Sequence, residues 1–488
     1  MQRLLRTTTS RQLTILETLY ETEDWLTLSQ LANLTNFPIR TIQHLIPILN
    51  EQFHPFTIQH HSSLGYKLFM PQYLGFEYVY EKIFDNSHEF SVLEAVFFNN
   101  AISTEQLSDL LFISPATVNR AIKAINTVFK EKNLDIKITN FNHQLIGNEL
   151  AIRNTMYQYL KEKYSLQTSP FPFEQILAYQ NMLNDVLSYT NLQRPYAELE
   201  LLSQIFVVVI TREKAGFSRD LTDHTALNNP IFHLLTAHKE YGAYFARTTK
   251  LIWDPRIIEQ LSAPFLNIHY FQHFSSLQKA AQNDPKLQKQ IDDIAVLIDN
   301  ISQELGITCD SLEKITLTLI NHYPLFIGEN HILFNPRKEM LANLSTDYPR
   351  LTRVIVDKIH DFSFTPTFKW DSDSLNESIF IIVTNWKHLI PQAIAIAKPL
   401  KVLLACTYEI GHAHIIKEMI VARPNLHINC DISVGTTFQQ FIDESKAYDI
   451  IICNSDKLIL DHPNILYFPP IPRKRDWVAL ADMIKKNQ

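Results

Sequence analysis

The order of apolar and polar positions repeats near the start of this chain, at an offset of 76 residues. The two copies are residues 31–50 and 107–126. Their apolar positions coincide in pairs: Leu31 with Leu107, Leu34 with Leu110, Phe37 with Ile113, Ile42 with Val118, Ile46 with Ile122, and Leu49 with Ile125. Two polar pairs also match, Thr41 with Thr117 and Asn50 with Asn126. This pattern predicts a short helix, a tight turn and a second amphipathic helix, which is the layout of a helix-turn-helix.

Each copy sits inside a larger pattern that we call a head. In the first head, apolar spacing predicts helices over 12–20 and 28–33 and a recognition helix over 38–50. Apolar segments at 56–58 and 66–68 flank a polar stretch and predict a β-hairpin wing. The side chains expected to face DNA from this recognition helix are Arg40, Thr41, Gln43 and His44.

The second head follows the same plan, with helices predicted over 92–99 and 104–111 and a wing over 136–138 and 144–147. Ser114 suits the N-cap and Pro115 the first position of its recognition helix. The side chains expected to face DNA are Thr117, Asn119, Arg120 and Lys123, since Asn and Arg suit base edges and Lys suits phosphate.

The two heads differ at two prolines. Pro38 stands where Ser114 caps the second recognition helix, and Pro47 removes a backbone hydrogen bond near the end of the first one. We therefore expect the second head to make more of the sequence-specific contacts. Helix-turn-helix shapes also occur in modules that bind proteins, but two copies, each followed by a wing, favour DNA binding.

The middle of the chain, from about 171 to 364, reads as helical, with stretches predicted at 176–187, 199–211, 291–305 and 312–323. Breaks at 283–285 and 335–336 suggest two bundles, about 170–285 and 286–370. Histidines are frequent here, but a lone histidine on such a helix is usually structural or on the surface. No catalytic motif stands out in this region.

After residue 370 the pattern becomes one of apolar strands alternating with helices. Strands are predicted at 379–383, 401–406, 426–430, 449–453 and 465–468, and helices at 413–422, 437–445 and 475–486. This alternation indicates a parallel sheet with both faces covered. Cys406 ends the second of these strands, where a thiolate could accept a phosphoryl group. The loop 407–412 has one glycine and an acidic Glu409, a poor anion site, so a packed or interface thiol is favoured.

The composition of the chain restricts which classes of function are possible. The chain has 488 residues, enough for several domains, and its 44 Lys and Arg against 51 Asp and Glu mean that any attraction for DNA must come from a local patch. Nine dispersed glycines exclude the dinucleotide-binding fingerprint and the P-loop. The four cysteines form no C-x-x-C pair. We expect no metal, no cofactor and no enzymatic activity, and a cytoplasmic protein without a membrane span or signal peptide.

Taken in order, these features resemble the Mga/AtxA family of virulence-type transcription regulators of Gram-positive bacteria. Residues 31–50 and 107–126 look like its two helix-turn-helix motifs, the middle like its two phosphotransferase-system (PTS) regulation domains, and the end, from Lys401 to Cys406 onward, like an enzyme-IIB domain. The resemblance implies a multidomain, predominantly α fold: two winged helix-turn-helix domains (1–70 and 71–165), two PRD-like bundles (166–285 and 286–375) and a C-terminal α/β parallel-sheet domain (376–488).

The resemblance also implies a function. The protein would be a homodimeric transcription regulator that binds double-stranded DNA and acts as a global activator or an activator of virulence genes. PTS phosphocarrier proteins would tune it by phosphorylating histidines, for which His238 and His322 are the candidates. The enzyme-IIB-like end would serve dimerisation or sensing. One alternative is a phosphocarrier enzyme of the PTS that acts through Cys406, and another is a helical scaffold that binds only proteins.

Overall fold

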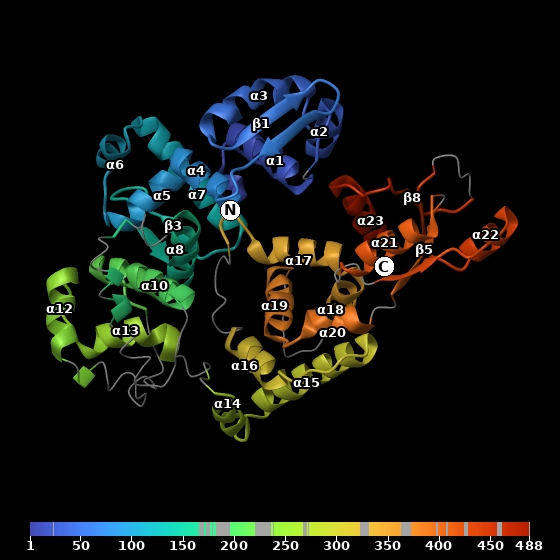
Figure 1. Cartoon of the computed structure of the whole chain (residues 1–488). Coiled ribbons are helices and arrows are strands. Elements are labelled where there is room, and N and C mark those ends of the chain that lie inside the picture. Colours follow the sequence, from blue (N-terminus) through green and yellow to red (C-terminus); the bar gives the residue numbers. More distant parts are fainter. Residues whose placement is uncertain are drawn as a thin grey trace. The chain divides into compact units, whose positions relative to one another are not determined.

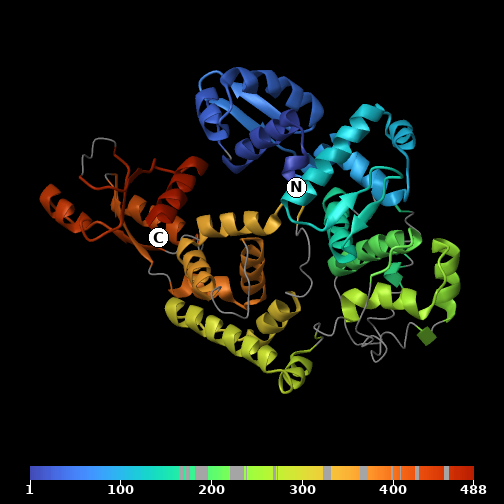
Figure 2. The ribbon, with the colours of Figure 1, turned by 180° about the vertical axis from the view of Figure 1, so that it is seen from behind.

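The computed structural model is mostly helical and divides into two compact units (Figure 1, Figure 2). It describes residues 1–22, 24–164, 170–171, 176–177, 179–181, 196–219, 236–237, 239–266, 271, 273–322, 331–362, 372–396, 399–406, 408–423, 428–455 and 461–487. Unit 1 comprises residues 1–270 and 321–335, and unit 2 comprises residues 271–320 and 336–488.

The first head has the predicted winged helix-turn-helix fold. After a short 3-10 helix η1 (Gln2–Leu4) come α1 (Thr7–Thr22), α2 (Leu28–Thr35), α3 (Ile39–Gln52), and the antiparallel strands β1 (Thr57–His61) and β2 (Gly65–Phe69). A capping box between Thr27 and Gln30 starts α2. Asn36, in the left-handed region at φ 55°, ends it and allows the turn into α3.

The second head repeats this architecture and adds a helix at each end. Its elements are α4 (Glu77–Asn86), α5 (His88–Phe98), α6 (Thr104–Leu111), α7 (Pro115–Glu131), β3 (Ile136–Ile138), β4 (Leu145–Gly147) and α8 (Glu149–Lys163). Phe112 lies 76 residues after Asn36 and takes the same left-handed conformation, at φ 54°. The sequence repeat is therefore also a repeat of the turn.

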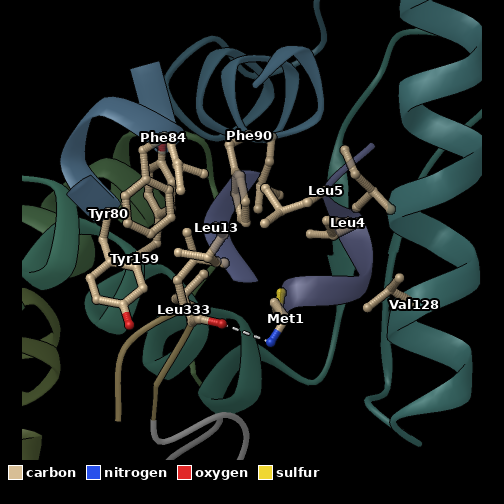
Figure 3. Packing of buried hydrophobic residues seen from close by; sticks show 14 of the residues in the cluster. Met1, Leu4, Leu5, Leu13, Tyr80, Phe84, Phe90, Val128, Tyr159 and Leu333 are labelled. Carbon is tan, nitrogen blue, oxygen red and sulfur yellow. Dashed lines mark hydrogen bonds between the residues drawn. The ribbon is translucent and has the colours of Figure 1, made fainter. Parts of the chain in front are cut away.

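One buried apolar cluster runs through both heads (Figure 3). Leu13 of α1, Phe90 of α5, Val128 of α7 and Leu333 all belong to it. Leu333 comes from the segment 331–335, which follows α16 in the chain, so a distant segment completes the core of the heads. The carboxylate of Glu162 fixes this segment by accepting the backbone N–H groups of Ile332, Leu333 and Phe334 at 2.5, 2.8 and 3.1 Å.

Three further helices of unit 1 are α10 (Tyr196–Lys214), α12 (Lys239–Thr249) and α13 (Pro255–Leu266). The helix predicted over 199–211 is confirmed as part of α10, and residues 206–212 of it are all buried. Its last turn carries Arg212 and Glu213, which are both buried. Arg212 forms an ion pair with Glu149 of α8, and Glu213 forms one with Arg153 of α8.

The helical part of unit 2 comprises α14 (Phe274–Ala281), α15 (Pro285–Leu305), α16 (Leu312–His322), α17 (Pro336–Asp347), α18 (Pro349–Phe362), α19 (Ser372–Asn385) and α20 (Leu389–Ile396). Both predicted breaks are confirmed, because Asp284 caps α15 and Pro336 begins α17. In the described part of the chain no single helix could span a bilayer, although the bent pair Leu375–Asn385 and Leu389–Ile396 matches a span in length and composition.

The strand predicted at 379–383 is wrong, because these residues lie within α19. Ile379, Ile381 and Ile382 are buried in the helical core of unit 2 together with Trp386. A short continuous apolar run fits a helix buried in a core as well as a strand, and its length alone does not separate the two.

The C-terminal α/β domain has the predicted parallel sheet. Its elements are β5 (Leu400–Ala405), α21 (Ile410–Val421), β6 (Ile428–Ile432), α22 (Phe438–Ser445), β7 (Ile450–Cys453), β8 (Ile465–Tyr467) and α23 (Lys474–Asn487). The strands lie in the order β6-β5-β7-β8, and every neighbouring pair is parallel. From β5 the chain passes first to β6 on one side and then to β7 on the other, so the strand order reverses between β5 and β7.

Candidate nucleic-acid interface

The recognition helix of the second head, α7, is amphipathic and well capped. The Ser114 hydroxyl accepts the backbone N–H of Thr117 at 3.2 Å, and Pro115 fills the first position. Val118, Ile122 and Ile125 are buried against the head's core, as predicted. This fixed inner face determines which side chains the helix presents to solvent.

The exposed face of α7 carries three of the four predicted DNA-facing residues: Asn119, Arg120 and Lys123. Thr117 is half-buried, and its hydroxyl accepts a hydrogen bond from Arg120 Nη2 at 3.1 Å. Thr117 therefore orients Arg120 rather than standing free on the surface. An oriented guanidinium loses less side-chain freedom when it binds, which favours bidentate contact with a base or phosphate.

A hollow of about 520 Å³ lies beside this face, between α7 and the loop that joins β3 to β4. It is lined by Asn119, Ile122, Lys123, Asn126, Thr127, Lys130, Asn140 and His143. Lys130 and Asn140 were not among the predicted site residues. Lys130 follows Lys123 by seven residues, two helical turns, so the predicted stripe could have been extended to reach it.

The repeated asparagines, Asn50 and Asn126, hold each wing to its recognition helix. Asn126 Nδ2 donates to the carbonyl of Ile138 at 2.9 Å, and its Oδ1 accepts the N–H of Ile138 at 2.7 Å. Asn50 makes the same two bonds to Ile58, at 3.0 and 2.6 Å. These two polar marks of the repeat are thus explained by the architecture of the head and not by contact with DNA.

Replacing Asn126 with Asp tests this account. The carboxylate keeps the acceptor for the Ile138 N–H but cannot donate, so the Ile138 carbonyl loses its partner and faces a like partial charge. We expect a loss of about 1–3 kcal/mol in the free energy of unfolding. Thermal unfolding followed by circular dichroism measures this, with Asn119→Asp on the exposed face as the control for the added charge. Equal losses in the free energy of unfolding from the two substitutions would contradict this structural role of Asn126.

The first head presents Arg40, Gln43 and His44 on the exposed face of α3, with Thr41 half-buried. Pro38 makes no side-chain cap, in contrast to Ser114. Pro47 lies on the exposed side, and α3 continues past it to Gln52. The proline therefore does not end the helix, and α3 keeps a full outward face.

The remaining predicted sites lie away from the heads in the sequence. His238 lies outside the described residues, and His322 is the last residue of α16, with its side chain outside the description. Cys406 directly follows β5, as predicted, and is half-buried. Among the described residues, no group of three or more His, Cys, Asp or Glu side chains could hold a metal ion.

Comparison with known proteins matches both heads to family models. Residues 7–63 match the M protein trans-acting positive regulator (MGA) HTH domain, and residues 72–160 match the Mga helix-turn-helix domain. A "putative trans-acting regulator" of Streptococcus pneumoniae is 25% identical over 481 residues, which is 97% of this chain and 95% of that protein. The "capsule synthesis positive regulator AcpA" of Bacillus anthracis is 25% identical over 224 residues, 44% of this chain and 45% of that protein. The two matched domains and these relatives support a transcription regulator of the Mga/AtxA type.

Proposed function

We propose that this regulator binds double-stranded DNA in the cytoplasm through both heads, with α7 of the second head as the main sequence-reading element. The observation that carries the proposal is the exposed row of Asn119, Arg120 and Lys123 on a capped helix with a fixed inner face. An Asn amide can bond an adenine edge and an Arg guanidinium a guanine edge, while Lys contacts phosphate.

The first head supports this binding from α3. Its exposed face offers one permanent cation, Arg40, and two polar groups, Gln43 and His44, for a second contact with the DNA duplex. Two relatives are named as regulators, one of them a positive regulator of capsule synthesis, which supports a role as an activator of virulence-type genes.

A titration of full-length protein against duplex DNA, followed by fluorescence anisotropy at several salt concentrations, tests the proposal. We expect binding whose affinity falls steeply with salt, because cations on the heads displace counterions from phosphates. The full chain is the right sample, since buried ion pairs join α8 to α10 and a cut after the heads would break them. Absence of duplex binding, or binding that salt leaves unchanged, would refute the proposal.

We further propose that the protein acts as a homodimer. DNA-binding proteins with this architecture are usually symmetric dimers, and their operators mirror that symmetry. The α/β domain carries exposed apolar side chains suited to a contact between copies, among them Ile410 and Ile415 of α21 and Ile471. Sedimentation analysis that finds only monomer at concentrations where DNA is bound would contradict this.

Regulation by the PTS is the last part of the proposal. The family resemblance supports it, with His238 and His322 as candidate phosphorylation sites. Incubation with purified PTS phosphocarrier proteins and radiolabelled phosphoenolpyruvate, followed by peptide mapping, tests it. Label on either histidine would support this regulation, whereas label confined to Cys406 would favour the phosphocarrier alternative.

A further inference from the structure

Three side chains meet at the carboxyl-terminal edge of the parallel sheet, where the strand order reverses. Cys406 directly follows β5, Asn454 directly follows β7, and His412 lies in the first turn of α21. Cys406 Sγ lies 3.0 Å from His412 Nδ1, and Asn454 Nδ2 donates to the same sulfur at 3.4 Å. Such edges are where doubly wound sheets bind ligands and perform chemistry.

The hydrogen bonds define the tautomer of the neutral His412 ring. Its Nε2 lies 2.6 Å from the carbonyl oxygen of Pro470, and a carbonyl only accepts, so Nε2 carries the proton. In the neutral imidazole Nδ1 is therefore the free base, and it accepts the Cys406 thiol proton. The backbone at Pro470 thus holds the ring in the tautomer that a base for Cys406 requires.

We propose that Cys406 is a nucleophilic thiol activated by His412, and that the site reacts with hydroperoxides to form a sulfenic acid. The thiol proton moves to His412 Nδ1, and the sulfur attacks one peroxide oxygen. The O–O bond breaks as the S–O bond forms, and the leaving oxygen takes the proton from Nδ1. The sulfur loses two electrons, the peroxide gains them, and water or an alcohol is released.

The surroundings of the sulfur suit this reaction. Asn454 is buried, and its amide donates to the thiolate and then to the sulfenate without supplying a charge. Cys406 is half-buried and so open to a small reagent, while the exposed Tyr408 ring packs edge-on against His412 at 5.3 Å. A thiol beside an imidazole base is the recurring arrangement of activated cysteines.

The other three cysteines provide controls within the same molecule. Burial raises the pKa of the Cys430 thiol to about 11. Burial also raises the pKa of Cys453, which donates to the Ser455 carbonyl. Cys309 is half-buried like Cys406, but its described contact is the Ser311 hydroxyl, 3.9 Å away. Cys309 is therefore matched to Cys406 in exposure and differs in its partner.

The experiment exposes full-length protein to hydrogen peroxide, traps sulfenic acid with dimedone and maps the adduct by mass spectrometry. We expect the Cys406 adduct to form at least about tenfold faster than the Cys309 adduct, and none on Cys430. His412→Gln should slow the Cys406 reaction by about tenfold or more. His414→Gln, on the exposed face of the same helix, should leave it unchanged.

Equal rates at Cys406 and Cys309 in the unaltered protein would overturn the proposal without any variant. An unchanged rate in folded His412→Gln would overturn the role of the imidazole. Should that variant lose its fold, the initial rate of iodoacetamide alkylation of each cysteine in the unaltered protein still decides the matter. Preferential alkylation of Cys406 supports activation, and parity with Cys309 refutes it.

Discussion

Replacing Arg120 and Lys123 together with alanine is expected to weaken duplex binding by about 2–4 kcal/mol, roughly 30- to 1,000-fold. Both side chains stand exposed on α7, so their removal does not disturb the buried face of Val118, Ile122 and Ile125. The loss is then one of contact with DNA and not of folding. Fluorescence anisotropy with an operator duplex measures it, and the thermal midpoint should stay unchanged.

The two single variants should affect DNA binding in different ways. Arg120→Ala is expected to reduce discrimination between operator and unrelated duplex, because its guanidinium is oriented by Thr117 for a base edge. Lys123→Ala should weaken binding to both duplexes alike and lower the slope of log affinity against log salt by about one. A uniform loss in both variants would mean that Arg120 also binds only phosphate.

The control is a double variant with the same change of net charge elsewhere. Lys286→Ala with Lys289→Ala removes two exposed cations from α15 in unit 2. We expect less than about twofold change in affinity, since these lysines lie outside the heads. An equal loss in the two double variants would point to net charge as the cause and would remove α7 from its assigned role.

Local signals account for what the sequence predicted well. The second helix of the second head was predicted at 104–111 and is observed as Thr104–Leu111, because a Ser103–Gln106 capping box starts it. Ser114 and Pro115 begin α7 as expected, and Asp284 caps α15 at the predicted break 283–285, although that helix is predicted only from residue 291. In each case the residues that decide the boundary lie within one turn of it.

The features that the sequence did not reveal depend on contacts between distant segments. Glu162 binds the backbone at Ile332, which is 170 residues away, and no local pattern marks either partner. Asn126 belongs to the sequence repeat, but its hydrogen bonds to the wing are visible only in three dimensions. The misassigned segment 379–383 has the same cause, because burial within a helical bundle makes all sides of a helix apolar.

The second large effect is expected from Arg153→Met, in a buried ionic network that joins α8 to α10 and α13. Arg153 bonds Glu149 at 2.8 Å, Glu213 at 2.9 Å and the amide oxygen of Gln260 at 2.9 Å. The Glu213 side chain is only 1% exposed, so removing Arg153 leaves a buried carboxylate poorly compensated. We expect a loss of about 3–5 kcal/mol in the free energy of the transition in which α10 separates from the second head. Chemical denaturation followed by circular dichroism measures it.

Arg256→Met is the matched control, because Arg256 is the other arginine paired with Glu213. Its Nη2 lies 3.6 Å from that carboxylate, and its side chain is 58% exposed, so we expect a loss below about 1 kcal/mol. Equal losses in the two variants would mean that removal of any positive charge near Glu213 matters and burial does not.

The same network reaches the wing of the second head. Arg212 of α10 bonds Glu149 through Nη2 at 2.6 Å and donates to the carbonyl of Leu145 in wing strand β4 at 3.0 Å. The helical region thus fixes one strand of the second wing directly. In Arg153→Met we therefore expect two unfolding transitions, with α10 separating from the second head before the head unfolds. A single transition, merely shifted to lower denaturant, would show that the head and α10 remain one cooperative unit without Arg153.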